Sequence, residues 1–235
     1  MKNNETIITW PSDPLIVFGD IHGLSHWKKV VDKNPDCRFL FLGDYLDPYS
    51  NIPHIVLINN LKEIIQLKKE REDEVILLLG NHDLHYLDLT VDPCSRFDYE
   101  IEEEAYAQFS ENHCLFTFAF QENNYIFTHA GISERWFYDD FGGDPNKNIA
   151  EQLNNPHRDQ LPALRRCGSL RGGDWSLVGG ILWADIDELN DPLQGYTQIV
   201  GHNRVGRILR RTVNGGEIIF CDCLYNEMWL KLESN

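Results

Sequence analysis

The sequence has 235 residues, of which 42% are hydrophobic, and its formal net charge at pH 7 is −16. A chain of this length can bury one sizeable core, so we expect a single domain over residues 1–235. Polyanion affinity comes largely from lysines and arginines that replace counterions, so the net charge argues against general nucleic-acid or anionic-membrane binding.

Three units of buried strand, polar turn and helix follow one another in the first part of the chain. Apolar runs at 15–18, 38–42 and 75–79 each lead into a glycine and then into polar residues. Helices are expected between them at 26–32 and 52–70, the second from apolar residues at helical spacing. Such repetition indicates parallel strands with crossover helices, and ligands of such sheets bind beyond the carboxyl ends of the strands.

The middle of the sequence departs from the repeated unit of strand, polar turn and helix. A helix with an acidic face is expected at 98–112. Two strands, 115–120 and 125–127, are expected to form a hairpin, and a short helix is expected at 149–153.

The last third of the chain is expected to be less regular. Residues 156–180 are rich in arginine and glycine and too irregular for core, so they are a candidate wall of a substrate site. The final strands are expected to form an antiparallel end around the Asn214-Gly215 turn, at 210–213, 217–222 and 228–232.

Signals for export are not found in the sequence. Residues 1–10 are polar and lack the apolar segment of a signal peptide, and no apolar run approaches membrane-spanning length. The six cysteines are too sparse for a disulfide scaffold. We therefore expect a reduced, cytoplasmic protein without membrane contact, and the sequence does not predict its oligomeric state.

Five expected strand ends carry side chains that can bind a metal ion. They are Asp20 and His22, Asp44 and Asp47, Asn81 and His82, His129, and His202. Residues two apart in an extended chain point to the same side, so Asp20 and His22 can bind one ion. The other histidines are expected to be core or surface residues: His26, His54, His85, His113 and His157.

This ordered set resembles the calcineurin-like metallophosphoesterase superfamily, in particular its phosphoprotein phosphatase branch and the bacterial and phage relatives of that branch. The resemblance spans residues 19–204, and residues 179–185 are similar to the Leu-Leu-Trp-Ser-Asp stretch of those phosphatases. It implies an α/β fold, a two-sheet mixed β-sandwich flanked by helices, with two divalent ions at its top.

The resemblance also implies roles for individual residues. Asp20 and His22 would hold the first ion, and Asp44 would bridge both. The second ion would be completed by Asn81, His129 and His202. His82 matches the general acid, and Asp47 matches the residue that orients it.

The chemistry of these residues supports the resemblance. Ligation by Asp, Asn and His suits Mn²⁺, Fe or Zn²⁺, and Mn²⁺ is the expected ion. Two such ions about 3.5–4 Å apart can hold a bridging hydroxide and both ends of an in-line displacement at phosphorus. Asp47 can hydrogen-bond His82 and is expected to keep it cationic.

The sequence departs from the phosphatase pattern at three positions. Pro48 stands where those enzymes carry a phosphate-binding arginine, and Arg171 is the expected substitute because neighbouring glycines permit close approach. Arg165 and Arg166 are the alternatives. Asp83 replaces the usual glutamate of the third motif. Arg204 stands where many superfamily members have a histidine, so it is not assigned to metal.

The expected function is hydrolysis of phosphomonoesters by a metal-bridging hydroxide, with phosphoserine or phosphothreonine in proteins as substrate. One alternative is a phosphodiester or dinucleoside polyphosphate hydrolase, because bacterial relatives of the branch do this. Another is a metal-binding scaffold of the same fold without catalysis. The expected partner is therefore a phosphorylated protein or small phosphoester.

Overall fold

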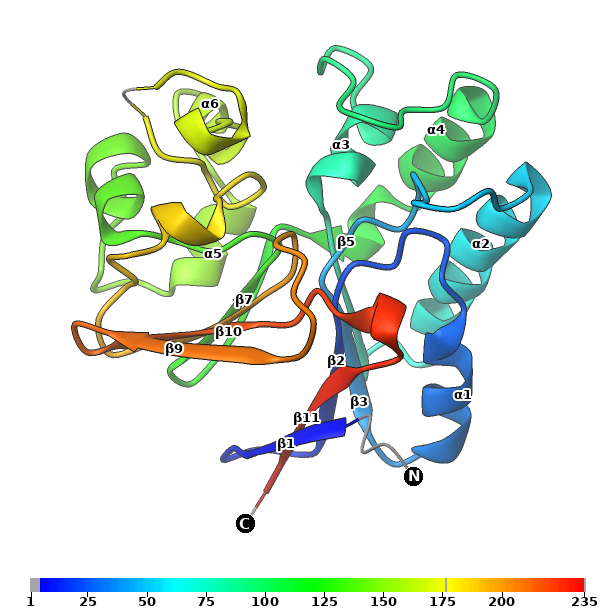
Figure 1. Cartoon of the computed structure of the whole chain (residues 1–235), viewed down its shortest axis with the longest axis horizontal. Coiled ribbons are helices and arrows are strands. Elements are labelled where there is room, and N and C mark those ends of the chain that lie inside the picture. The colour runs from blue at the N-terminus through cyan, green and yellow to red at the C-terminus, as the bar shows by residue number, and fades with distance from the viewer. Residues whose placement is uncertain (1–4, 176, 235) are drawn as a thin grey trace. The chain divides into compact units, whose positions relative to one another are not determined.

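The computed structural model describes residues 5–175 and 177–234, and the chain divides into two compact units. The first unit comprises residues 1–116 and 223–235, and the second comprises residues 117–222. Each unit is built around one mixed sheet with helices beside it (Figure 1). The mixed α/β class, with two mixed sheets and flanking helices, is confirmed. The expectation of a single domain stays a prediction.

The first sheet has the strand order β1-β11-β2-β3-β4-β5. Its strands are β1 (Glu5–Thr9), β2 (Leu15–Phe18), β3 (Arg38–Phe41), β4 (Val75–Leu78), β5 (Phe116–Thr117) and β11 (Trp229–Glu233). The neighbours β2, β3 and β4 are parallel, as the repeated units predict. All four residues of β2 are buried, as expected for a continuous apolar run in a parallel sheet.

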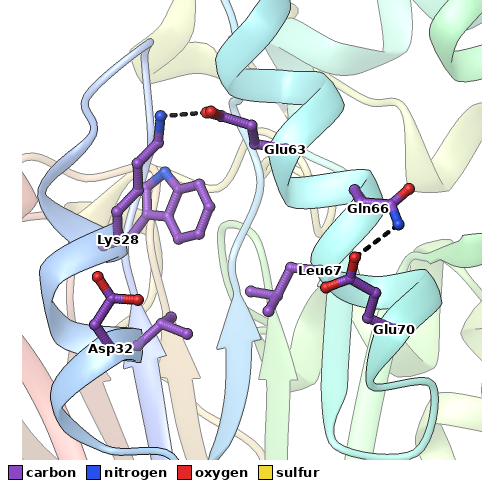
Figure 2. A pocket seen from close by; sticks show the side chains of 8 residues that line it. Lys28, Asp32, Glu63, Gln66, Leu67 and Glu70 are labelled. Carbon is purple, nitrogen blue, oxygen red and sulfur yellow. Dashed lines mark hydrogen bonds and ion pairs between the residues drawn. The ribbon is translucent and has the colours of Figure 1, made fainter.

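The helices of the first unit follow its parallel strands. They are α1 (His26–Lys33), α2 (His54–Glu70), α3 (Asn81–Leu87) and α4 (Glu102–Glu111). The first two lie side by side and enclose a groove of about 320 Å³, in which Lys28 pairs with Glu63 (Figure 2). The residues that line this groove all belong to α1 and α2, and Gln66 donates to Glu70 at 2.8 Å across one turn of α2.

The last strand pairs differently from the sequence prediction. Residues 228–232 are expected to extend an antiparallel end of the chain, but β11 lies parallel to β1 and antiparallel to β2 in the first sheet. Leu230 and Leu232 are fully buried there, and the alternate residues Trp229, Lys231 and Glu233 are partly exposed. β1 itself was not predicted, although four of its five residues are β-branched, a composition that favours strands.

The second sheet has the strand order β6-β7-β8-β10-β9. Its strands are β6 (Ala119–Glu122), β7 (Tyr125–Thr128), β8 (Thr197–Val200), β9 (Leu209–Val213) and β10 (Gly216–Phe220). β7 and β8 are parallel, and β9 and β10 form the predicted antiparallel hairpin around the Asn214-Gly215 turn. The hairpin expected from residue 115 begins only at Ala119, with β6 antiparallel to β7.

Short helices flank the second sheet. They are α5 (Ile149–Asn154), α6 (Leu161–Leu164) and a π-helical turn at Trp136–Asp140. The side chain of Asn154 accepts hydrogen bonds from the backbone of Phe118 and Ala119, which fastens α5 to β6. Ala163 is buried and its carbonyl accepts from the indole of Trp136 at 3.0 Å. Part of residues 156–180 is therefore core, contrary to the prediction.

A glycine lets the loops after β3 and β4 meet. Gly43 has φ +108°, a conformation that side-chain-bearing residues rarely adopt. A Cβ atom at this position would lie 2.4 Å from the backbone nitrogen of Gly80.

Within residues 5–175 and 177–234, no helix combines the length and the apolar character that crossing a bilayer requires.

Candidate active site

The loops that follow β2, β3 and β4 lie at one edge of the first sheet, because these strands are parallel neighbours. Backbone hydrogen bonds join the first two loops. The N–H groups of Ile21 and His22 donate to the carbonyl of Asp44 at 3.1 and 2.7 Å. The N–H of Gly23 donates to the carbonyl of Tyr45 at 3.0 Å. These bonds hold two of the predicted metal-binding loops together.

Asp20, His22 and Asp44 bring their donor atoms together. The Nε2 atom of His22 lies 3.5 Å from Oδ2 of Asp44 and 3.8 Å from Oδ2 of Asp20. Its Nδ1 atom lies 2.8 Å from the carbonyl oxygen of Leu46, so Nδ1–H donates there and Nε2 turns a lone pair toward the carboxylates. Burial, and then the neighbouring His82, lowers the pKa of His22 to about 3, which leaves the ring neutral.

This donor set fits a divalent metal ion. Its two carboxylates and one imidazole offer ligand atoms that all lie within 4.8 Å of one another. Oxygen and imidazole donors suit Mn²⁺, Fe and Zn²⁺. Asp20 and Asp44 are both buried, and a divalent cation held by their carboxylates would offset the cost of that burial.

Asp83 joins the second loop to the third. Its fully buried carboxylate accepts from the backbone N–H groups of Asp44 at 2.7 Å, Tyr45 at 2.8 Å and Gly80 at 2.8 Å. Burial raises the pKa of Asp83 to about 6, and the three hydrogen bonds oppose that rise. Asp83, which stands in place of the usual glutamate of the third motif, therefore accepts hydrogen bonds from the backbone of two loops. This role explains why a carboxylate stands at this position.

Asp47 and His82 form the predicted pair. The Nδ1 atom of His82 lies 2.7 Å from Oδ2 of Asp47, and the hydroxyl of Tyr86 donates to Oδ1 of Asp47 at 2.7 Å. The Nε2 atom of His85 lies 3.0 Å from Oδ2 of Asp47. Asp47 is fully buried, and three side chains surround its carboxylate in place of water.

The same contacts shift the pKa values of Asp47 and His82. Burial alone raises the pKa of Asp47, but its three side-chain hydrogen bonds outweigh burial and lower that pKa below 3.8. For His82, burial outweighs the hydrogen bond to Asp47, and the charge of Arg96 acts in the same direction as burial, so the pKa falls below 6.5. The hydrogen bond and the charge of Asp47 favour the cationic ring and burial opposes it, so the expectation that Asp47 keeps His82 cationic stays a prediction.

Arg96 is a site residue that sequence reasoning missed. Its Nη2 atom lies 3.1 Å from Nε2 of His82, and its Nε donates to the carbonyl of Asp47 at 3.0 Å. Its guanidinium carbon lies 3.9 Å from the centre of the Tyr49 ring. Arg96 belongs to the irregular segment between α3 and α4, where no residue spacing marks it.

His85 was expected to be an ordinary core or surface residue, but it touches the site. His82, His85 and Tyr86 stand at helical spacings of three and four on α3, so they share one face, and this signal could have found them. The Sγ atom of Cys94 lies 3.1 Å from Nδ1 of His85 and 3.5 Å from Nδ1 of His82. Burial raises the pKa of Cys94 to about 12, so it is a protonated thiol at neutral pH.

Several residues of this site have a left-handed backbone. The angle φ is 43° at His22, 53° at Asp44, 56° at Asp47 and 65° at Arg96. Such conformations cost roughly 1–3 kcal/mol each and persist where the surrounding structure fixes them. They are characteristic of sites where the direction of a side chain matters.

His129 and His202 meet in the second unit. They follow the parallel neighbours β7 and β8, and the N–H of Gly201 donates to the carbonyl of His129 at 2.7 Å. The Nε2 atom of His129 lies 3.2 Å from Nδ1 of His202. Asn81 begins α3 in the first unit, so the complete second ligand set stays a prediction.

Arg171 is held by other side chains of the second unit. Its Nε lies 2.8 Å from Oδ2 of Asp185, and its Nη2 donates to the side chain of Asn203 at 2.6 Å. Of the two alternatives, Arg166 contacts Asp140 at 2.6 Å. The phosphate-binding role of Arg171 stays a prediction, and its observed contacts are those of a brace between loops.

Comparison with protein families agrees with the site. A family model described as calcineurin-like phosphoesterase matches residues 14–209. By sequence, the chain is similar to serine/threonine-protein phosphatase PP1-delta of Caenorhabditis elegans, with 41% identity over 75 residues. This alignment covers 30% of the chain and 23% of the relative, so the chain matches less than a quarter of that protein's length.

Solved structures resemble the whole chain. A cold-active protein-tyrosine phosphatase of a psychrophilic Shewanella species aligns with a TM-score of 0.59 and 15% identity, over 100% of this chain and 78% of that one. A second structure of a cold-active protein tyrosine phosphatase aligns with a TM-score of 0.57 and 14% identity, over 99% and 76% of the two chains. At such identities the likeness concerns the fold.

Proposed function

Because the chain belongs to the calcineurin-like phosphoesterase family, we propose that it hydrolyses phosphomonoesters with bound metal ions, acting on phosphoserine and phosphothreonine in proteins. The observation that carries the proposal is the setting of His82. Its Nδ1 faces Asp47 at 2.7 Å, and its ring centre lies 5.3 Å from that of His22 in the carboxylate–imidazole cluster. A proton carrier beside a metal-binding cluster suits cleavage of a phosphoester.

We propose two divalent ions, with Mn²⁺ as the first choice and Fe or Zn²⁺ as alternatives. Asp20 and His22 would hold the first ion, and Asp44 would be shared. The remaining proposed ligands are Asn81, His129 and His202. When bound, such ions supply a nucleophile at neutral pH and neutralise charge on the phosphoryl oxygens.

The proton for the leaving oxygen would come from His82. Since Nδ1–H donates to Asp47, Nε2 is the atom that would carry this proton. A substrate phosphate brings negative charge close to the ring and favours its protonated form, against the burial that lowers its pKa. Asp47, held in turn by the hydroxyl of Tyr86, would keep the ring in one orientation.

A phosphodiester or dinucleoside polyphosphate is the second candidate substrate. It is favoured by Pro48, which stands where phosphatases resembling this chain carry a phosphate-binding arginine. A metal-binding scaffold without catalysis is the non-enzymatic alternative. The contact of His82 with Asp47 opposes it, because a scaffold does not need an oriented proton carrier.

Turnover of a matched substrate panel with Mn²⁺ tests the proposal. The panel contains a phosphoserine peptide, a phosphotyrosine peptide, a phosphodiester and a dinucleoside tetraphosphate, and His82→Asn is assayed beside the wild type. Preference for the phosphoserine peptide, lost in the variant, is the expected result. Preference for the diester or dinucleotide would transfer the assignment to the second candidate, and bound metal without turnover of any member would favour the scaffold.

A further inference from the structure

The second motif lacks the phosphate-binding arginine of the phosphatases that this chain resembles, but another arginine, Arg96, reaches the site. Pro48 occupies the position of the missing residue, and Tyr49 follows it. The guanidinium of Arg96 stacks 3.9 Å above the ring of Tyr49. The same ring meets that of His22 edge-on, with 4.8 Å between the ring centres. Tyr49 therefore connects Arg96 with the metal-binding cluster.

We propose that Arg96, supported by Tyr49, is the residue that binds the substrate's phosphoryl group beside His82. The inference rests on the proposed phosphoester substrate and names the group that recognises it. It replaces Arg171 as the candidate for this role.

The hydrogen bonds of Arg96 leave its outer nitrogens directed at the site. Nε donates to the carbonyl of Asp47 at 3.0 Å, which anchors the inner edge of the guanidinium. Nη2 lies 3.1 Å from Nε2 of His82, and Nη1 donates to the hydroxyl of Ser95 at 3.3 Å. A phosphoryl oxygen is a stronger acceptor than an imidazole or a hydroxyl, since it carries charge. An arriving phosphate would therefore take these donors and leave Nε2 of His82 facing the leaving oxygen.

The charge of Arg96 also suits an anion. The groups that its nitrogens contact, a carbonyl, a hydroxyl and an imidazole, carry no negative charge. Arg171 differs, because its Nε contacts the carboxylate of Asp185 at 2.8 Å. The positive charge of Arg96 is thus available for a ligand, whereas that of Arg171 is compensated by the protein.

The backbone of Arg96 points to the same conclusion. With φ at 65°, Arg96 adopts a left-handed conformation that is uncommon for a long side chain. Such conformations cluster at ligand-binding sites, where they fix the direction of a side chain. Here the conformation accompanies a guanidinium that is stacked on Tyr49 and turned toward His82.

Binding of inorganic phosphate to the Mn²⁺-loaded full chain tests the inference. Arg96→Gln removes the charge, Arg96→Lys keeps the charge without the planar fork, and Tyr49→Leu removes the stacking surface. Arg71→Gln is the matched control, because Arg71 also lies over an aromatic ring, that of Phe39 at 5.0 Å, and also donates to backbone carbonyls. Its acceptors, the carbonyls of Pro35 and Cys37, precede β3, whereas the site follows it.

We expect Arg96→Gln to weaken phosphate binding by calorimetry, and phosphate inhibition of turnover, roughly 10–100-fold. Arg96→Lys should lose roughly 10-fold, and Arg71→Gln should bind as the wild type does. Unfolding temperatures are measured for every variant to establish which of them fold. If Arg96→Gln does not fold, phosphate binding by Arg96→Lys and Tyr49→Leu tests the inference instead. Unchanged phosphate affinity in folded Arg96 variants would overturn the inference, as would a wild type that binds no phosphate.

Failure of this inference can be told apart from failure of the proposed function. A wild type that turns over a phosphopeptide, with unchanged phosphate binding in Arg96→Gln, overturns the role of Arg96 alone. A wild type that binds phosphate through Arg96 but hydrolyses no member of the substrate panel overturns the proposed function and supports the binding role.

Discussion

The imidazole of His82 is bound to the carboxylate of Asp47 across 2.7 Å, and the second oxygen of that carboxylate is held by Tyr86. A carboxylate accepts only, so this contact fixes the proton of the neutral ring on Nδ1. Nε2, which Arg96 Nη2 faces at 3.1 Å, is then the ring atom that would exchange a proton with a substrate. Because Asp47 is fully buried, solvent does not compete for the contact.

Replacing His82 by asparagine should lower kcat roughly 10²–10⁴-fold, which is the usual range for loss of a general acid. The metal content should stay the same, because His82 is not among the proposed ligands Asp20, His22, Asp44, Asn81, His129 and His202. Turnover of the phosphoserine peptide and elemental analysis of the purified protein measure the two quantities. His113→Asn, at an exposed position, is the control. Unchanged turnover in folded His82→Asn would contradict the assignment.

Replacing Asp47 by asparagine should lower kcat roughly 10–10³-fold with little change in KM, because the ring loses its fixed orientation and its ionic partner. Tyr86→Phe removes one hydrogen bond to the same carboxylate and should have a smaller effect in the same direction. Steady-state kinetics of the two variants would show this order. A larger defect in Tyr86→Phe than in Asp47→Asn would mean that the tyrosine acts independently of the carboxylate.

Replacing Asp83 by asparagine should lower the free energy of unfolding by roughly 2–4 kcal/mol, because an amide cannot accept from three buried N–H groups. Urea unfolding measures this change, and Asp73→Asn, at an exposed position on the same unit, is the control. An equal loss of unfolding free energy in Asp83→Asn and Asp73→Asn, or no loss in either, would refute the role of Asp83 as the link between the loops.

The parallel strands could be predicted from sequence, because each combines an apolar run with a glycine and a polar turn. The helices expected at 26–32 and 52–70, the second from its apolar spacing, lie within two residues of the observed bounds of α1 and α2. The pairing of β11 could not be predicted in this way. Its alternation of apolar and polar residues indicates a strand but not a neighbour, and its neighbours β1 and β2 lie at the opposite end of the sequence.

The cluster of Asp20, His22 and Asp44 could be predicted for the same reason as the strands, since Asp20 and Asp44 each stand one glycine beyond a buried run. Arg96 could not be predicted. Its position depends on the loop between α3 and α4, on the stacking surface of Tyr49 and on a left-handed backbone, and none of these leaves a periodic pattern in the sequence.

Asp222 should make the stability of the protein depend on pH. Burial raises the pKa of this carboxyl to about 6, from a usual 3.8, although the charges of Arg204 and Arg171 oppose the rise. Between about pH 4 and 6 the folded protein therefore binds this proton more tightly than the unfolded chain does. The contribution of Asp222 to the free energy of unfolding consequently falls as pH rises through this window, by roughly 1–3 kcal/mol in total.

Asp222→Asn copies the shape of the neutral acid and cannot ionise, so it isolates this dependence. We expect the variant and the wild type to have similar unfolding free energies near pH 4, and the variant to be the more stable by roughly 1–3 kcal/mol at pH 7. Urea unfolding at four pH values, with chelator present to remove bound metal, gives the difference curve. For the control Asp159→Asn, at an exposed position of the same unit, the unfolding free energy should change with pH as it does in the wild type. Two results would contradict the prediction: an unfolding free energy of Asp222→Asn that also changes with pH as the wild type's does, or a wild type that gains stability over the variant as pH rises. Either would mean that Asp222 is ionised in the folded protein, with Arg204 and Arg171 outweighing its burial.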